Sequence, residues 1–157
     1  MPWTRSALLA TVFTVGCLSP STPLQRLTDS AYDFNLATRF GRTDVALENV
    51  SRDEQASFSK RHETWGAQLR IVDSEVIEIA RTDNGVAQVT VDLQWHRANE
   101  SLIHATRLRQ AWKDIGPRWV LEGELAVAGD AAIFERQDLG RAPRPFARAL
   151  ATKVIRE

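Results

Sequence analysis

The spacing of apolar residues changes once along this chain, near residue 68. Before that point apolar side chains recur at three- and four-residue steps, the spacing of helices. After it, apolar and polar residues alternate, as they do in strands with one buried face. Helices followed by strands predict an α+β domain, with three N-terminal helices packed on a curved four-stranded antiparallel sheet.

Three helices are predicted before this change, at 24–40, 44–50 and 51–65. Asp44 suits the N-cap of the second helix. Ser51 is followed three residues later by Glu54, a capping-box pattern that should open the third helix. In that helix Phe58 faces inward, whereas His62 is expected on the exposed side.

Four strands are predicted after the change, at 68–81, 86–97, 101–113 and 118–126. Gly85 supplies the positive φ of a hairpin between the first two strands. The three turns set the register, and the pairs expected to face each other across it are Ile79–Val89, Asp73–Trp95, Trp95–His104 and Trp112–Trp119.

Charged residues of the last three strands provide a check on this register. Arg107 is expected between Asp92 and Glu124, and Arg109 opposite Glu122. Opposite charges facing across strands indicate a solvated sheet face. The other face carries tryptophans and aliphatic residues, so the helices must cover it.

The first twenty residues are typical of an export signal. Residues 7–16 are uncharged but shorter than the ~20 residues that a membrane-spanning helix needs. The segment ending in Cys17 resembles the lipobox of bacterial lipoproteins, although Thr14 stands where leucine is usual. The resemblance implies lipidation of Cys17, and Leu18 after it implies the outer membrane. Cleavage by an ordinary signal peptidase, giving a soluble exported protein, is the alternative.

These segments predict four regions along the chain. Residues 1–16 are the signal peptide, 17–23 the lipid-attachment cysteine and linker, 24–126 the α+β domain, and 127–157 a basic, partly ordered extension. The segment 141–157 carries five basic residues and one acidic residue. It could dock on the domain, lie on an anionic membrane or remain free.

Composition excludes several function classes. Twenty basic residues balance twenty acidic ones, which argues against nucleic-acid binding. The single cysteine excludes an intrachain disulfide and a cysteine-based zinc site. The three histidines fall on different faces, so no metal site is expected. No glycine-rich phosphate loop is present, and no cofactor is expected.

The order of elements resembles the nuclear transport factor two-like superfamily, which includes SnoaL-type and ketosteroid-isomerase-type proteins. The residues that carry the resemblance are Ala31–Phe34, Gly41–Asp44, Val50–Asp53 and the Trp112/Trp119 pair. The resemblance implies a sheet curled into a cone whose mouth forms a pocket. Some members are enzymes, and many are binding or accessory modules.

Five side chains on the inward face are the predicted pocket residues: Trp95, His104, Thr106, Gln110 and Trp112. In the expected register Asp73, Trp95 and His104 lie in one row. A carboxylate beside an imidazole is the arrangement of a general base, so His104 and Asp73 are the catalytic candidates. If the chain bulges at Asp73–Ser74, both side chains point to solvent and His104 is structural.

Three functional hypotheses follow. The first is a non-catalytic binding or accessory module of the bacterial cell envelope, with a membrane anchor and a small apolar ligand or a protein as its partner. The second is a small isomerase or dehydratase that uses His104 with Asp73. The third is a structural domain that forms a homodimer.

Overall fold

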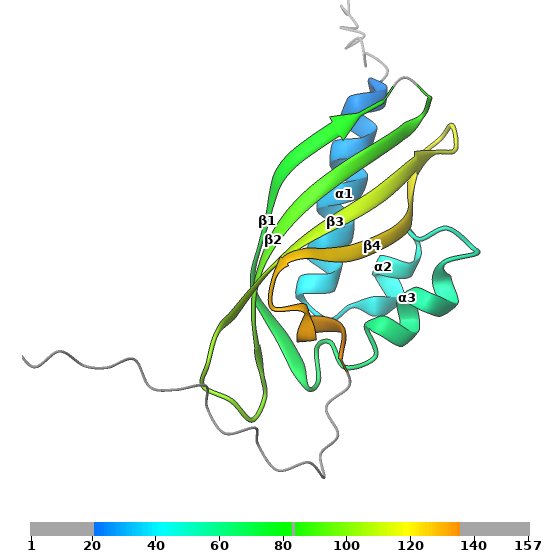
Figure 1. Cartoon of the computed structure of the whole chain (residues 1–157). Helices are drawn as coiled ribbons and strands as arrows, with labels where there is room; N and C mark the ends of the chain where they lie inside the picture. Colours follow the sequence, from blue (N-terminus) through cyan, green and yellow to red (C-terminus); the bar gives the residue numbers. More distant parts are fainter. Residues whose placement is uncertain (1–20, 83, 136–157) are drawn as a thin grey trace, which may run out of the picture.

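The computed structural model describes residues 21–82 and 84–135, a four-stranded antiparallel sheet in the order β1-β2-β3-β4 with three helices (Figure 1). The elements are α1 (Pro23–Arg39), α2 (Thr43–Leu47), α3 (Gln55–Arg61), β1 (Leu69–Arg81), β2 (Val86–Arg97), β3 (His104–Asp114), β4 (Trp119–Gly129) and the 3-10 turn η1 (Ala131–Phe134). The predicted α+β architecture is confirmed. The predicted signal peptide, Cys17 and the basic segment 141–157 lie outside the described residues.

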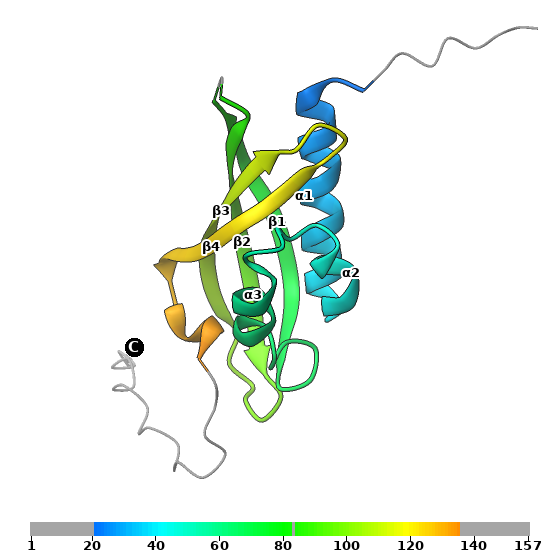
Figure 2. The same cartoon turned by 90° about the vertical axis from the view of Figure 1, so that its right-hand side faces the viewer.

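Helix α1 follows the sequence pattern closely. The Thr22 hydroxyl accepts a hydrogen bond from the Gln25 N–H at 3.1 Å, which caps the first turn. The helix buries its apolar stripe, including Leu27, Ala31 and Phe34, against the sheet. Figure 2 shows α1 running along one side of the sheet, with α2 and α3 beside its lower part. Among the described residues, no helix is long and apolar enough to cross a membrane.

Helices α2 and α3 are shorter than predicted. Asp44 lies inside the first turn of α2 rather than at its N-cap. The capping box expected at Ser51 does not form, because the Ser51 N–H donates to the Leu121 carbonyl of β4 at 2.9 Å. Glu54 therefore has no free N–H to reach back to, and its carboxylate contacts Arg61 instead.

The helices cover the tryptophan-bearing face of the sheet, as predicted. Trp95, Trp112 and Trp119 are fully buried there. Arg107 and Arg109 point to solvent on the opposite face. The arrangement follows from strand alternation, because residues one apart along a strand point to opposite faces.

The register between β2 and β3 matches the prediction along its whole length. Trp95 lies opposite His104, and Asp92 opposite Arg107. Two guanidinium nitrogens of Arg107 donate to Asp92 at 2.6 and 2.7 Å. This charged hydrogen bond lowers the pKa of the Asp92 carboxyl below its ordinary value. Strand β3 begins at His104, three residues later than predicted.

The predicted register between β1 and β2 is correct only near the hairpin. Ile79 lies opposite Val89, but bulges at 71/73 and 76/78 shift the rest of β1. Asp73 consequently lies opposite Gln94, and Ile71 takes the place opposite Trp95. The predicted row of Asp73, Trp95 and His104 is therefore wrong.

The register between β3 and β4 also differs from the prediction. The loop occupies 115–118, one residue later than expected, so Trp112 lies opposite Leu121 rather than Trp119, and a bulge follows between 121 and 123. Glu124 comes to lie opposite Gln110 on the inner face. The ion pairs predicted for Arg107 with Glu124 and for Arg109 with Glu122 are wrong, and Glu122 instead lies 3.2 Å from Lys113.

The folded domain continues past the predicted end of the last strand. Strand β4 runs to Gly129, and η1 follows it. The Asp130 side chain accepts a hydrogen bond from the Ala132 N–H at 2.9 Å, which caps the turn. Ile133 in this turn is fully buried in the core. Residues 127–134 therefore belong to the structural unit.

Candidate functional site

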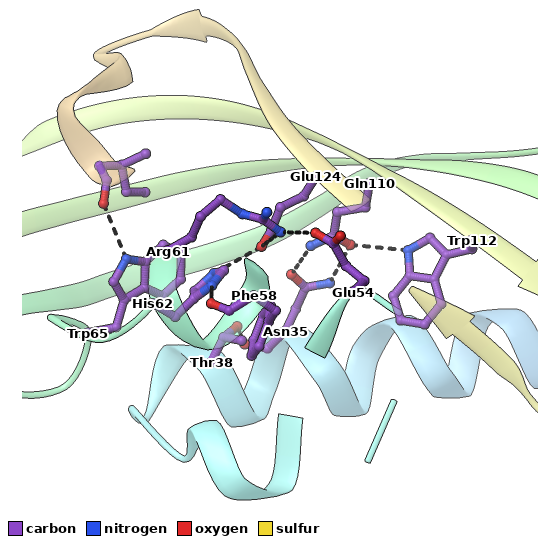
Figure 3. Close-up of polar contacts among 11 residues, drawn as sticks. Asn35, Thr38, Glu54, Phe58, Arg61, His62, Trp65, Gln110, Trp112 and Glu124 are labelled. Atoms are coloured by element: carbon purple, nitrogen blue, oxygen red, sulfur yellow. Dashed lines mark hydrogen bonds and ion pairs between the residues drawn. The ribbon is translucent and has the colours of Figure 1, made fainter. Parts of the chain in front are cut away.

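Four ionisable side chains meet inside the cone, between α3 and β4. They are Glu54, Arg61, His62 and Glu124, here called the cone network (Figure 3). Glu54 precedes α3, Arg61 ends it and His62 follows it. Glu124 projects from β4 toward them because the bulge between 121 and 123 reverses the alternation of that strand.

His62 links the two halves of the cone network. Its Nδ1 lies 2.9 Å from the Phe58 carbonyl oxygen, and its Nε2 lies 3.0 Å from Glu124 Oε1. A carbonyl only accepts, so Nδ1 carries a hydrogen. The 3.0 Å contact of Nε2 with Glu124 Oε1 pairs the imidazole with the carboxylate, although the two atoms do not have the geometry of a hydrogen bond.

Arg61 supplies the balancing positive charge. Its Nη2 hydrogen bonds with Glu54 Oε1 and lies 3.8 Å from Glu124 Oε1. The two carboxylates thus share one guanidinium, and the imidazole meets one of them. A buried charge is tolerated only when it is paired in this way.

Aromatic rings pack around His62, the buried centre of the cone network. The Phe58 ring stacks on His62 at 4.0 Å, and Trp65 and Phe134 pack edge-on at 4.2 and 5.7 Å. The side chains of His62 and Glu124 are both 1% exposed. The pair holds the residues that end α3 against β4, and in this state it is out of reach of a substrate.

A hollow of about 230 Å³ lies at the surface beside the cone network. It is lined by Lys60, Arg61, Glu63, Thr64 and Phe134. Pockets that enclose small molecules hold roughly 300–1,000 Å³. This hollow is smaller and leaves His62 covered, so it suits an ion or the tip of a side chain better than an enclosed substrate.

The predicted pocket residues are together on the inner face, but they are packed rather than open. Trp95 and Trp112 are 0% exposed, Gln110 is 1% and Thr106 is 3%. A side chain that lined a solvent-filled cavity would keep accessible surface. A ligand at these residues would therefore have to displace them.

The polar atoms of these residues are bonded to one another. The Gln110 and Asn35 amides exchange two hydrogen bonds, at 3.0 and 3.2 Å (Figure 3). The Trp112 indole N–H donates to Gln110 Oε1 at 3.3 Å, and the Trp95 indole N–H donates to the Thr106 hydroxyl at 2.9 Å. The polar side chains among the predicted pocket residues are thus paired without a ligand.

His104 lies at the edge of this interior, where its side chain is 16% exposed. Its ring stacks on Trp95 at 4.4 Å. Its Nδ1 lies 2.6 Å from Asp130 Oδ2, and its Nε2 lies 3.2 Å from Glu100 Oε2. The carboxylates beside His104 are thus Asp130 and Glu100.

Asp73, the predicted partner of His104, lies elsewhere. The bulges of β1 carry it out of the row, and its carboxylate lies 3.2 Å from Arg39 of α1. The alternative of a bulge at Asp73–Ser74 with both side chains in solvent is correct for Asp73, which is exposed, but the bulge lies one residue earlier, between Ile71 and Asp73, and the Ser74 hydroxyl is buried. Within 21–82 and 84–135, no group of histidine, cysteine and acidic residues has the arrangement of a metal site.

Sequence reasoning missed the cone network. His62 was predicted to be exposed on a helix that continued to residue 65, but the helix ends before it. Glu124 was predicted on the solvated face because no bulge was placed in β4. Gly123 was the available signal, since a glycine inside a strand often marks a bulge.

Comparison with solved structures identifies the fold. A ketosteroid isomerase-like protein from Erwinia carotovora atroseptica superposes with a TM-score of 0.55 at 8% identity, covering 66% of this chain and 95% of that one. A putative Ca/calmodulin-dependent kinase II association domain from Exiguobacterium sibiricum gives 0.56 at 10% identity, covering 69% and 95%. An NTF2-like protein from Cytophaga hutchinsonii gives 0.50 at 12% identity, covering 64% and 93%.

These similarities establish an NTF2-like fold for this chain, as the sequence resemblance predicted. No protein-family model matches the sequence, and no curated protein sequence matches it. At such low identity the matches carry the fold alone, and enzymes and non-enzymes share this fold.

Proposed function

We propose that this chain is a non-catalytic binding or accessory module of the bacterial cell envelope, exported and held at the outer membrane by a lipid on Cys17. The observation that supports the non-catalytic reading is the filled interior. Trp95 and Trp112 occupy the centre of the cone with no exposed surface, and their indole groups are bonded inside. Binding then takes place on the outside of the domain, which favours a protein partner over a small apolar ligand.

The acid–base groups of the interior support the same proposal. A general base must reach the proton that it removes, directly or through one water. His62 and Glu124 are buried and form an ion pair with each other, and a ring stacks on His62. The cone network therefore acts as a structural clamp.

An acid–base enzyme is the second candidate, and one contact favours it. Asp130 lies 2.6 Å from His104 Nδ1, as a residue that orients a general base would. His104 Nε2 would serve as the base once Glu100 moved away. Asp73 has no part in this version, because it is paired with Arg39.

A ligand screen separates the two candidates. A small molecule at about one hundred times its Kd raises the free energy of unfolding by about 2.7 kcal/mol. The module should show no such rise with a panel of steroids, fatty acids and aromatic acids. A rise in this free energy that is lost in His104→Gln and kept in His96→Gln would place a ligand site at His104, as the enzyme requires, and would overturn the filled interior. The structural-dimer hypothesis predicts a melting temperature that rises with protein concentration.

The anchor is tested by fractionation of cells that express the full chain. The proposal predicts recovery in the outer membrane, loss of fatty-acid labelling in Cys17→Ser, and unchanged labelling in the control Ser19→Ala. Globomycin, which blocks the lipoprotein signal peptidase, should leave the signal peptide attached. Unchanged labelling in Cys17→Ser would overturn the lipid anchor.

A further inference from the structure

Helix α1 exposes an apolar stripe on the side that faces away from the sheet. Tyr32, Leu36 and Phe40 recur every four residues and are 55, 56 and 68% exposed. Residues at this spacing lie on one line along a helix. Single exposed apolar residues are ordinary, but three aligned large ones form a surface that a partner can cover.

The surface around the Tyr32 end of this stripe is acidic, whereas at the other end Arg39 lies over the Phe40 ring and the exposed Arg42 follows. Asp29 and Asp33 lie on the same exposed side of α1. Asp33 has no ion-pair partner within the described part of the chain, and Asp29 accepts a hydrogen bond only from the neutral Gln25 amide. Arg39, the basic residue next to Phe40, is neutralised by Asp73 at 3.2 Å. A complementary occupant would carry apolar groups flanked by positive charge.

The C-terminal segment of the same chain has that chemistry. Residues 141–157 hold five basic residues and one acidic residue. Phe146, Ala149, Leu150 and Val154 fall at the three- and four-residue steps of one helical stripe. The acidic apolar stripe of α1 and this basic apolar segment therefore complement each other in charge and in hydrophobicity.

The described chain ends near one end of the stripe. Phe134 stacks on Trp65, whose indole N–H donates to the Ile133 carbonyl at 3.2 Å. The next residue, Gly66, is in backbone contact with Gly41, which follows Phe40. Since each extended residue spans up to about 3.5 Å, the few residues after 135 are long enough to reach α1.

We propose that residues 141–156 dock on the α1 stripe of the same molecule, with the apolar side chains over Tyr32, Leu36 and Phe40 and the basic ones beside Asp29 and Asp33. The contact hides a surface that would otherwise bind another molecule. The proposal holds whether or not the domain is anchored by lipid, so it stands apart from the proposed function. A second copy, an anionic membrane and an envelope protein are the competing occupants.

Disulfide trapping tests this docking. Cys17 is the only cysteine, so the full chain with Cys17→Ser accepts one designed pair without competition. The test pair is Leu36→Cys with Leu150→Cys. The control pair joins Arg109→Cys, which is exposed on the opposite face of the sheet, to the same Leu150→Cys. Leu36 is largely exposed, so its replacement leaves the core intact.

The proposal predicts a bond within one chain that forms at least about tenfold faster in the test pair than in the control, at a rate independent of protein concentration. Asp29→Asn with Asp33→Asn, or added salt, should reduce this ratio. Equal rates in the two pairs would overturn the proposal by showing an undocked segment. Bonds only between chains would assign the stripe to a second copy, and loss of the bond on adding anionic vesicles would assign the segment to the membrane.

Discussion

His62 Nε2 lies 3.0 Å from Glu124 Oε1, and both side chains are 1% exposed. The contact joins residues 62 positions apart, one from the end of α3 and one from a bulged strand. It fixes the helical side of the cone to the sheet at a point where water is absent. The clearest energetic effect of a buried ion pair is the loss of stability when one of its partners is removed.

We expect Glu124→Ala to lower the free energy of unfolding by about 3–5 kcal/mol, because it leaves the buried imidazole of His62 without its ion-pair partner, whereas Arg61 keeps Glu54. Urea denaturation measures the change. The control is Glu122→Ala on the same strand, whose exposed pair with Lys113 should contribute about 0.2–1 kcal/mol. Equal losses in the two variants would contradict the clamp role, as would additive losses in the double variant His62→Ala/Glu124→Ala.

The close approach of Gly41 and Gly66 gives a second prediction. A Cβ on Gly41 would lie 2.6 Å from the Gly66 Cα, and Gly41 has a φ of +67°. Gly116 also has a positive φ, +96°, but a Cβ there would meet nothing within 4 Å. Gly116→Ala should cost about 1–2 kcal/mol from backbone strain. Gly41→Ala should cost more by thermal denaturation, and equal costs would show that the backbone contact is unimportant.

The Asp92–Arg107 pair predicts a pH dependence of stability. Arg107 lowers the pKa of the Asp92 carboxyl below 3.8, chiefly through its hydrogen bond. A carboxyl whose pKa is lower in the folded state stabilises the protein fully above its unfolded pKa, and this stabilisation is lost as the pH falls through the folded pKa. Asp92→Asn should therefore destabilise the protein near neutral pH and have little effect in strong acid.

The effect should be small and should shrink with added salt, because the pair is solvated. NMR titration of the Asp92 carboxyl in the folded protein gives the pKa directly. A midpoint at or above 3.8, or an Asp92→Asn effect that is constant across pH, would contradict this prediction.

The sequence predicted those parts of the fold that local patterns determine. The buried apolar face of α1 and the helices before the meander follow from apolar spacing. The pairing of Trp95 with His104 follows from the turn residues. The exposure of Arg107 follows from alternation along β3. In each case neighbouring residues carry the signal, so no knowledge of distant packing was needed.

Bulges account for most of what the sequence did not predict. One extra residue in a strand exchanges its inner and outer faces, so an unplaced bulge misplaces every residue beyond it. Asp73 was assigned to His104 for this reason, and Glu124 to the solvated face. The burial of His62 depends on a tertiary contact, since Glu124 pairs with its Nε2, and Trp65 and Phe134 pack on its ring.

The central claim is that the chain fills its own cone, and hydrogen exchange of two indole N–H groups tests it most directly. Trp95 donates to Thr106 and Trp112 donates to Gln110, both in the interior. The account predicts that both indoles exchange only as fast as the whole domain unfolds, and that their NMR signals stay unchanged when small apolar ligands are added. Indoles that exchange far faster than global unfolding, or that shift with a ligand, would show an open pocket and contradict the account.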